Sequence, residues 1–171
     1  MNTVLKNLLI NEDEKAEGAI CLKSSPTIVG IPIGTMCNYR CVFCKDDTAA
    51  NDFVPMEVTY QEFEKIAKMI RNPANIGLFS WGEPLLNSNY KRMFQYVSGT
   101  NPDSFISIAT NGSLMNEEVI DMFAGHGLVH VNVSLNAPNN PLYKKITGTG
   151  KFELVKSNIE KLNNRAKGML F

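Results

Sequence analysis

The feature that most constrains the fold of this chain is a repeated alternation of strand-like and helix-like patterns. Short β-branched and apolar runs alternate with segments whose apolar residues recur every three or four positions. The expected strands are residues 27–34, 76–80, 105–109 and 128–135, and residues 169–171 resemble the opening of a fifth. This order favours an α/β fold with a parallel sheet and right-handed crossovers. The first strand is apolar on both faces, so we expect it to be buried, although Pro32 removes one ladder donor.

Four helices are expected to follow these strands. Thr59 and Glu62 are spaced as in a capping box, so the first helix should begin near Thr59. The second should end at residues 98–99, and the third should run from a cap at Asn116 to a stop at Gly125. The expected apolar faces are Phe63, Ile66, Ala67 and Ile70 in the first helix, Tyr90, Met93, Phe94 and Val97 in the second, and Phe152, Val155, Ile159 and Leu162 in the fourth.

Polar residues follow each expected strand at its carboxyl end. Three cysteines come after the first strand, residues 82–84 after the second and residues 110–112 after the third, and Ser134 and Asn136 end the fourth. In parallel sheets, ligands bind at the carboxyl ends of the strands. The sequence therefore predicts one binding site built from four loops at this edge of the sheet.

The cysteines after the first strand are Cys37, Cys41 and Cys44, within a run of eight residues. Thiolate sulfur is the soft ligand that iron–sulfur clusters and zinc prefer. Three local thiolates hold only three irons of a four-iron cluster, which leaves the fourth iron free to bind something that is not protein. Open coordination is typical of a reactive metal centre, whereas a structural site is usually closed.

Three cysteines can also serve roles other than cluster binding. Core packing suits them poorly, because their neighbours in the run are Asn, Tyr and Arg. Disulfides are disfavoured where thiols stay reduced. A zinc site whose fourth ligand is Cys21, His126 or His130 remains open, although either histidine is better explained as a surface or core residue.

Length and charge narrow the class of protein. The 171 residues suffice for one domain with a real core. Seventeen basic and seventeen acidic residues cancel, which gives no support for binding to nucleic acid or to a membrane surface. No signal peptide and no apolar run long enough to span a membrane is found, so we expect a cytoplasmic protein with reduced thiols.

The cysteine spacing, with Phe43 directly before the last cysteine, resembles that of the radical S-adenosylmethionine (radical SAM) enzymes. Gly82-Glu83-Pro84 after the next strand strengthens the resemblance, which runs from about Ile28 to the end. It implies a partial (β/α) barrel of about four β/α units with parallel strands, the later units being missing. We expect an N-terminal leader over residues 1–26 and a partial core domain over residues 27–171.

The resemblance implies a role for each candidate residue. Cys37, Cys41 and Cys44 would hold a [4Fe–4S] cluster whose open iron binds S-adenosyl-L-methionine, and an electron would cleave that cofactor to a 5′-deoxyadenosyl radical that abstracts hydrogen from a substrate. The cofactor-binding residues would be Phe43 near the adenine, Gly82, Glu83 and Pro84 at the methionine amino group, Thr110 and Ser134 at other polar groups, and Asn136 at the ribose. Each also has a structural interpretation, as loop packing, turn formation or helix capping. No catalytic residue can be chosen beyond the cluster ligands.

The resemblance says less about the partners of the protein and about the branch of the family to which it is most similar. It implies an electron donor such as flavodoxin or ferredoxin, and a substrate that is a small molecule or a peptide. Residues 146–148 resemble enzymes of early molybdopterin biosynthesis, whereas residues 81–87 resemble enzymes that mature peptides or proteins, and the second branch is slightly favoured. The alternative function is a catalytically inactive metal-binding remnant that holds zinc or an iron–sulfur cluster.

Two departures from the family pattern matter. Trp81 stands where the family usually has a glycine, so the turn should keep Trp81 in an ordinary backbone region. The chain also stops where a fifth unit would begin, which predicts a truncated frame or a fragment with an unpaired strand edge. We therefore expect the isolated chain to be poorly stable or to self-associate.

Overall fold

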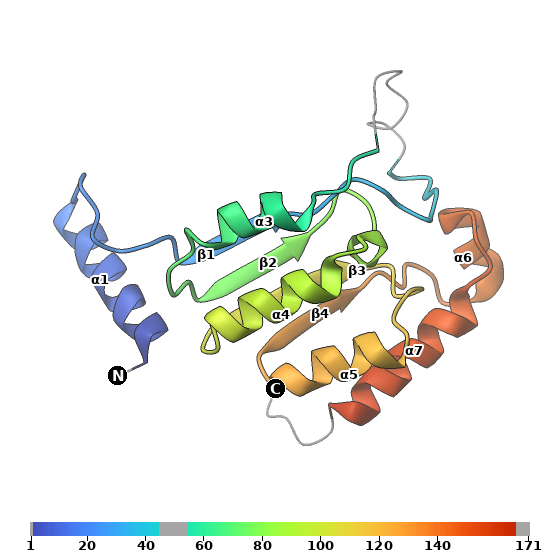
Figure 1. Cartoon of the computed structure of the whole chain (residues 1–171). Coiled ribbons are helices and arrows are strands. Elements are labelled where there is room, and N and C mark those ends of the chain that lie inside the picture. The colour runs from blue at the N-terminus through green and yellow to red at the C-terminus, as the bar shows by residue number, and fades with distance from the viewer. Residues whose placement is uncertain (1, 45–54, 167–171) are drawn as a thin grey trace.

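Four parallel strands form one sheet in the computed structural model, which describes residues 2–44 and 55–166. The strands are β1 (Ile28–Pro32), β2 (Asn75–Phe79), β3 (Phe105–Thr110) and β4 (Val129–Val133), and they pair in the order of the sequence (Figure 1). The parallel sheet and all four strand positions are as predicted. The expected irregular stretch of residues 45–57 lies mostly, and the expected fifth strand wholly, outside the described residues.

The helices α3 (Tyr60–Ala67), α4 (Tyr90–Thr100), α5 (Glu117–His126) and α7 (Phe152–Arg165) were predicted, and the short 3₁₀ turn η1 (Pro84–Leu86) follows β2. The capping box at Thr59 is present, with the Glu62 N–H donating to the Thr59 hydroxyl and the Glu62 carboxylate accepting from the Thr59 N–H. The predicted ends of α4 and α5 were wrong. Both Gly99 and Gly125 lie inside their helices, and α5 ends at Gly127, which supplies the left-handed backbone of the cap.

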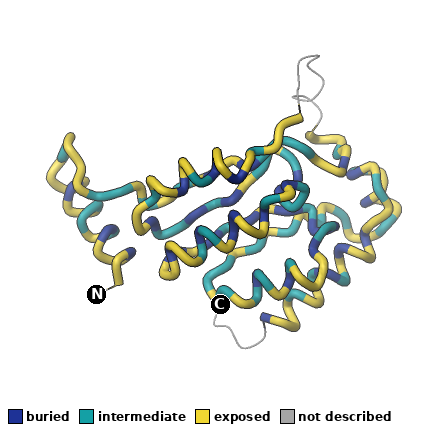
Figure 2. Tube along the Cα trace, in the orientation of Figure 1, coloured by how far each residue is buried: buried dark blue, intermediate teal, exposed yellow. Residues whose placement is uncertain are grey.

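Two helices were not predicted from the sequence. Helix α1 (Thr3–Glu17) lies within the expected leader, and α6 (Asn140–Thr147) precedes α7. Most residues of α1 are exposed, and buried residues gather instead in the strands and on the helix faces that meet them (Figure 2). No helix in the described ranges 2–44 and 55–166 has the length and apolar character needed to cross a membrane.

One face of the sheet carries the core. Helices α3, α4 and α5 pack on it, because each strand lies beside its predecessor and right-handed crossovers then place these helices on one side. A row of paired residues, Ile31, Leu78, Ile108 and Val131, runs across this face. The principal core residues are Ile31, Ile33, Phe63, Ile76, Leu78, Met93, Phe94, Val97, Ile106, Ile108, Met115, Ile120 and Phe123.

The opposite face of the sheet is largely open. Ile28 in β1 is 74% exposed, and Phe79, Ala109 and Asn132 on the neighbouring strands are also exposed. The prediction that the first strand is buried was therefore wrong, because it assumed cover on both faces. Pro32 is tolerated because β1 is an edge strand of the described sheet. The predicted burial of Ile66 in α3 was also wrong, since it is 39% exposed.

A second apolar cluster lies beside the first and joins the cysteine loop to the C-terminal helices. Tyr39 follows Cys37 by two residues, and its ring meets that of Tyr143 of α6 edge to face at 6.2 Å. Phe152 and Val155 of α7 complete the buried part of this cluster. The last turn of α6 also binds the loop directly, because the Arg40 N–H donates to the Thr147 carbonyl at 3.1 Å. The cysteine loop is thus packed on helices more than 100 residues away in sequence.

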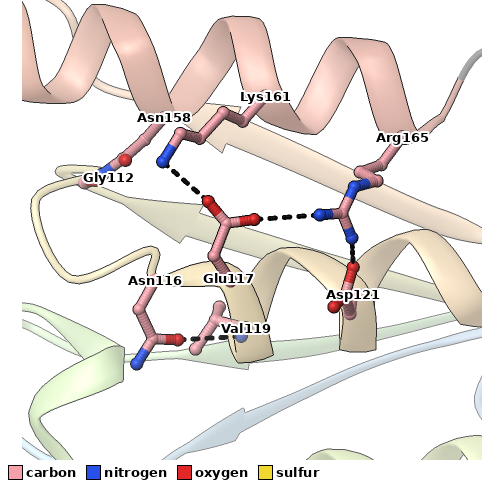
Figure 3. Close-up of polar contacts among 8 residues, drawn as sticks. All are labelled: Gly112, Asn116, Glu117, Val119, Asp121, Asn158, Lys161 and Arg165. Atoms are coloured by element: carbon pink, nitrogen blue, oxygen red, sulfur yellow. Dashed lines mark hydrogen bonds and ion pairs between the residues drawn. The ribbon is translucent and has the colours of Figure 1, made fainter.

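Helix α7 is fastened to α5 and to the turn after β3 (Figure 3). The Glu117 carboxylate pairs with Lys161 at 2.7 Å and with Arg165 at 3.0 Å, and Arg165 also pairs with Asp121. These four side chains are about half exposed, so each pair adds little to stability. The buried contact is different: the Asn158 side chain donates to the Gly112 carbonyl at 2.9 Å.

Replacing Asn158 with alanine should therefore destabilise the chain more than replacing its exposed neighbour Lys161. Asn158→Ala leaves the buried Gly112 carbonyl without its donor, which costs about 1–3 kcal/mol. Urea unfolding followed by circular dichroism measures both variants against the unmodified chain. Equal losses for Asn158→Ala and Lys161→Ala would contradict a special role for the buried hydrogen bond.

Candidate functional site

The three cysteines lie on one loop after β1, at the carboxyl end of the sheet. Cys37 and Cys44 are exposed and Cys41 is half-buried. The Cys44 N–H donates to the Cys41 carbonyl at 3.1 Å, which folds the loop back on itself. Burial raises the pKa of Cys41 to about 11, with the charges of Cys44 and Cys37 adding to the rise.

The three thiols are chemically suited to bind a [4Fe–4S] cluster, although their sulfur atoms do not already form a metal site. Within residues 2–44 and 55–166, no three His, Cys, Asp or Glu side chains are arranged as a ready metal site. The side chains of Cys21, His126 and His130 are among those described, so these residues do not form a zinc site with the cysteines either. Three neighbouring thiolates repel one another until a metal cation offsets their charge. Accessible thiols on a single loop match the ligand type and number that such a cluster needs.

The segment before Cys37 is held by the turn after β2. The Trp81 N–H donates to the Gly34 carbonyl at 3.1 Å, and the Glu83 N–H donates to the Met36 carbonyl at 2.8 Å. Between them, Gly82 lies against the backbone so closely that an added Cβ would overlap Met36 and stand 2.7 Å from the Thr35 oxygen. Gly82 is therefore required for close packing of two backbones, not for a positive φ.

Glu83 joins the turn after β2 to the turn after β3. Its side chain is buried, at 2% exposure, and its carboxylate accepts from the Thr110 hydroxyl and from the Asn111 N–H, each at 2.7 Å. The Leu85 N–H donates to the same carboxylate at 3.1 Å. Burial raises the pKa of Glu83, and these three hydrogen bonds oppose the rise. The side chains of Glu83 and Thr110 thus bind each other inside the protein.

The remaining predicted residues surround this buried pair. Gly82 and Pro84 flank Glu83, and Pro84 is buried at the start of η1. Ser134 and Asn136 are exposed directly after β4, and the Ser134 N–H donates to the Thr110 carbonyl at 2.9 Å. The turns after β2 and β3, the cysteine loop and the end of β4 are therefore joined by hydrogen bonds at one edge of the sheet. The sequence predicted that these four loops meet at this edge, and that they form a binding site stays a prediction.

Two aromatic side chains are exposed at this edge. Phe43 is 60% exposed on the cysteine loop and Trp81 is 78% exposed on the turn after β2. Among the described residues other than glycine, only Asn72 has a positive φ, so Trp81 keeps an ordinary backbone conformation as predicted. The tryptophan is accommodated because its side chain is largely exposed to solvent and needs no space in the packed turn.

Several supporting residues were missed by the sequence analysis. The buried Asn87 donates to the Ile33 carbonyl at 2.7 Å and to the Val58 carbonyl at 3.0 Å, which ties the exit of β1 to the entry of α3. Asn38, next to the first cysteine, bonds to side chains of the turn after β3. Nothing in local spacing marks these asparagines, because their partners lie tens of residues away.

Gly82→Ala should disrupt the cysteine loop. The new methyl group overlaps main-chain atoms of Met36, which no side-chain rotation relieves, so we expect a loss of about 1–3 kcal/mol in unfolding free energy and reduced iron uptake. Gly125→Ala is the matched control, because nothing lies within 4 Å of its added Cβ and alanine favours α5 by about 1 kcal/mol. Urea unfolding and iron analysis measure both, and an undiminished stability of Gly82→Ala would contradict the packing argument.

Glu83 should also give the chain a distinct pH dependence. Burial raises the folded pKa of Glu83 above the ordinary value of a glutamate, so protonation favours the folded state and the stability it contributes is lost as pH rises through the folded pKa. Relative to Glu83→Gln, the unmodified chain should therefore gain stability as pH falls from about 7.5 to 5. Urea unfolding at several pH values measures the difference between the two chains. A difference that shrinks on acidification would contradict this assignment.

A family profile and several known proteins match this chain. The sequence profile of the Radical SAM superfamily matches residues 31–168. The GTP 3′,8-cyclase of Desulforamulus reducens is 31% identical over 135 residues, which cover 77% of this chain and 41% of the relative. A probable GTP 3′,8-cyclase of Methanococcus aeolicus is 34% identical over 133 residues, which cover 77% of this chain and 44% of the relative. The chain thus spans less than half the length of these curated relatives.

Solved structures share the fold at lower identity. Streptococcus suis SuiB bound to the precursor peptide SuiA superposes with a TM-score of 0.65 at 18% identity, over 91% of this chain and 34% of SuiB. The protein anSMEcpe with bound AdoMet and a Cp18Cys peptide gives a TM-score of 0.66 at 17% identity, over 82% of this chain and 41% of anSMEcpe. The predicted α/β fold, a partial barrel of the radical SAM type, is confirmed. With a family profile that covers most of its length, this chain belongs to the Radical SAM superfamily.

Proposed function

We propose that this chain binds a [4Fe–4S] cluster through Cys37, Cys41 and Cys44 and uses it to cleave S-adenosyl-L-methionine reductively. The observation that carries the proposal is the cysteine motif at the end of β1, inside the region that the family profile matches. The bound cofactor supplies a 5′-deoxyadenosyl radical that abstracts hydrogen from the substrate. The protein supplies the ligands and the orientation of the cofactor.

Groups on the loops around the cysteines supply the contacts that we propose with the cofactor. We assign the backbone carbonyls of Gly82-Glu83-Pro84 to its amino group, Phe43 to its adenine, and Ser134 and Asn136 to its polar groups. The side chains of Glu83 and Thr110 have a supporting role in this proposal. Their oxygen atoms are engaged with each other, and both residues are almost fully buried. They hold two turns in place so that main-chain atoms face the cofactor.

The partners we propose follow from this chemistry. Reductive cleavage consumes an electron, so the chain needs a donor such as flavodoxin or ferredoxin, and we expect it to meet that donor in the cytoplasm. The substrate is a small molecule or a peptide. Sequence relatives named as GTP 3′,8-cyclases favour cofactor biosynthesis, with GTP as the first substrate to test, over the peptide maturation that residues 81–87 had slightly favoured.

Anaerobic reconstitution with iron and sulfide tests the proposal. We expect about four irons and four acid-labile sulfides per chain, and reductive release of 5′-deoxyadenosine from S-adenosylmethionine. Alanine at Cys37, Cys41 or Cys44 should abolish stable cluster binding, because each supplies one of three ligands. Cys21→Ala is the matched control and should bind iron normally, since Cys21 lies in the segment after α1. Normal iron content in all three ligand variants would overturn the assignment.

A second candidate function is a metal-binding module without turnover. It would use the same three free thiols, which suit zinc as well as an iron–sulfur cluster. Zinc bound without iron would exclude the radical SAM proposal outright. A complete cluster without cleavage of S-adenosylmethionine by the 171-residue chain would favour the inactive module.

A further inference from the structure

Two main-chain hydrogen bonds hold the peptide on either side of Cys41. The Arg40 N–H donates to the Thr147 carbonyl at 3.1 Å, and the Val42 N–H donates to the Ile146 carbonyl at 2.8 Å. Both acceptors lie in the last turn of α6, which stands beside the loop that follows β1 (Figure 1). The main chain around Cys41 is thus attached to the end of one helix.

The end of α6 can supply these carbonyls because the helix itself does not use them. The last four carbonyls of an α-helix have no partner within the helix. Gly148 ends α6 in the left-handed region, at φ 75°. The buried Thr147 hydroxyl donates to the Tyr143 carbonyl at 2.8 Å and accepts from the Thr149 N–H at 3.3 Å, which closes the turn. The carbonyls of Ile146 and Thr147 therefore remain for the cysteine loop.

Side chains reinforce the same attachment. The Tyr143 hydroxyl donates to the Tyr39 hydroxyl at 3.1 Å, and Tyr143 is fully buried. The Cys41 side chain packs against the second apolar cluster, to which both tyrosines belong. Cys37 and Cys44 are exposed instead. Cys41 is therefore the cysteine of the motif that is packed against α6 as well as bonded to it through its main-chain neighbours.

We propose that the C-terminal turn of α6 positions Cys41 before the cluster binds, with Tyr143 and Gly148 as positioning residues. This inference rests on the proposed function. A ligand that its surroundings already hold in place needs less ordering when metal binds, and such supporting contacts raise metal affinity. Residues 146–148, which resemble one branch of the family, thereby gain a role in the geometry of a cluster ligand.

Alanine at Gly148 tests this assignment, and alanine at Gly127 is the matched control. Both glycines end a helix at φ 75°, so each substitution forces a side chain into left-handed backbone with similar strain. An added Cβ at Gly148 would lie 3.6 Å from the Arg40 carbonyl oxygen, whereas no described atom lies within 4 Å of one at Gly127. Gly127 also precedes β4, at the opposite edge of the sheet from the cysteine loop. Tyr143→Phe is a second variant, which removes only the hydroxyl that binds Tyr39.

Pulses of iodoacetamide on the reduced, metal-free chain measure the attachment without any cluster. Mass spectrometry of the peptides gives the alkylation rate of each cysteine. Gly148→Ala and Tyr143→Phe should each raise the rate at Cys41 by about fivefold, because release of the loop exposes that thiol, and should leave the rate at Cys21 unchanged. Gly127→Ala should change neither rate.

Iron binding after anaerobic reconstitution completes the test. Gly148→Ala should lose iron to a chelator faster than Gly127→Ala, although urea unfolding should show similar losses of stability in both. A purely structural role would affect the two glycine variants alike.

Two results would overturn the inference: an unchanged rate at Cys41 in either Gly148→Ala or Tyr143→Phe, or equal loss of iron from the two glycine variants. An unmodified chain that binds no iron would instead refute the proposed function. The alkylation rates would still decide whether α6 holds Cys41, so the two failures are distinguishable.

Discussion

The site depends above all on one buried carboxylate. Glu83 accepts hydrogen bonds from the Thr110 hydroxyl, the Asn111 N–H and the Leu85 N–H, while its own N–H binds the carbonyl of Met36. These contacts join the loop before the cysteines, the turn after β2 and the turn after β3. Burying an ionised carboxylate to 2% exposure is unfavourable unless hydrogen-bond donors surround it. The burial of Glu83 therefore requires the three segments to keep this arrangement.

The open face of the sheet explains why the site lies where it does. Because the strands follow one another in order, helices α3, α4 and α5 cover a single face and leave the other exposed. A doubly wound sheet would have covered both faces and placed its site at a switch in strand order. Here the loops at the carboxyl ends border an accessible surface with exposed Phe43, Trp81 and Asn132.

The sequence comparison and the structural comparison match different proteins. The two results are compatible because both concern the same region of the chain. The curated relatives are GTP 3′,8-cyclases at 31% and 34% identity, whereas the solved neighbours, at 17% and 18%, include peptide-bound proteins. The second group demonstrates a shared fold only. The region in common holds the cysteine loop and the turns that support it. In our proposal this region serves the cofactor.

Local chemistry in the sequence was enough to predict the strands, the capping box at Thr59, the cysteine motif and the edge at which the loops meet. Each is set by neighbouring residues, through side-chain periodicity, cap spacing or ligand spacing. Tertiary structure alone decided that Ile28 is exposed, that Gly82 must lack a Cβ, that Glu83 and Thr110 bind each other, and that Asn38 is tied to Asn111. These features join segments 27 to more than 70 residues apart, and a single sequence records which residues are present but not which distant backbones meet.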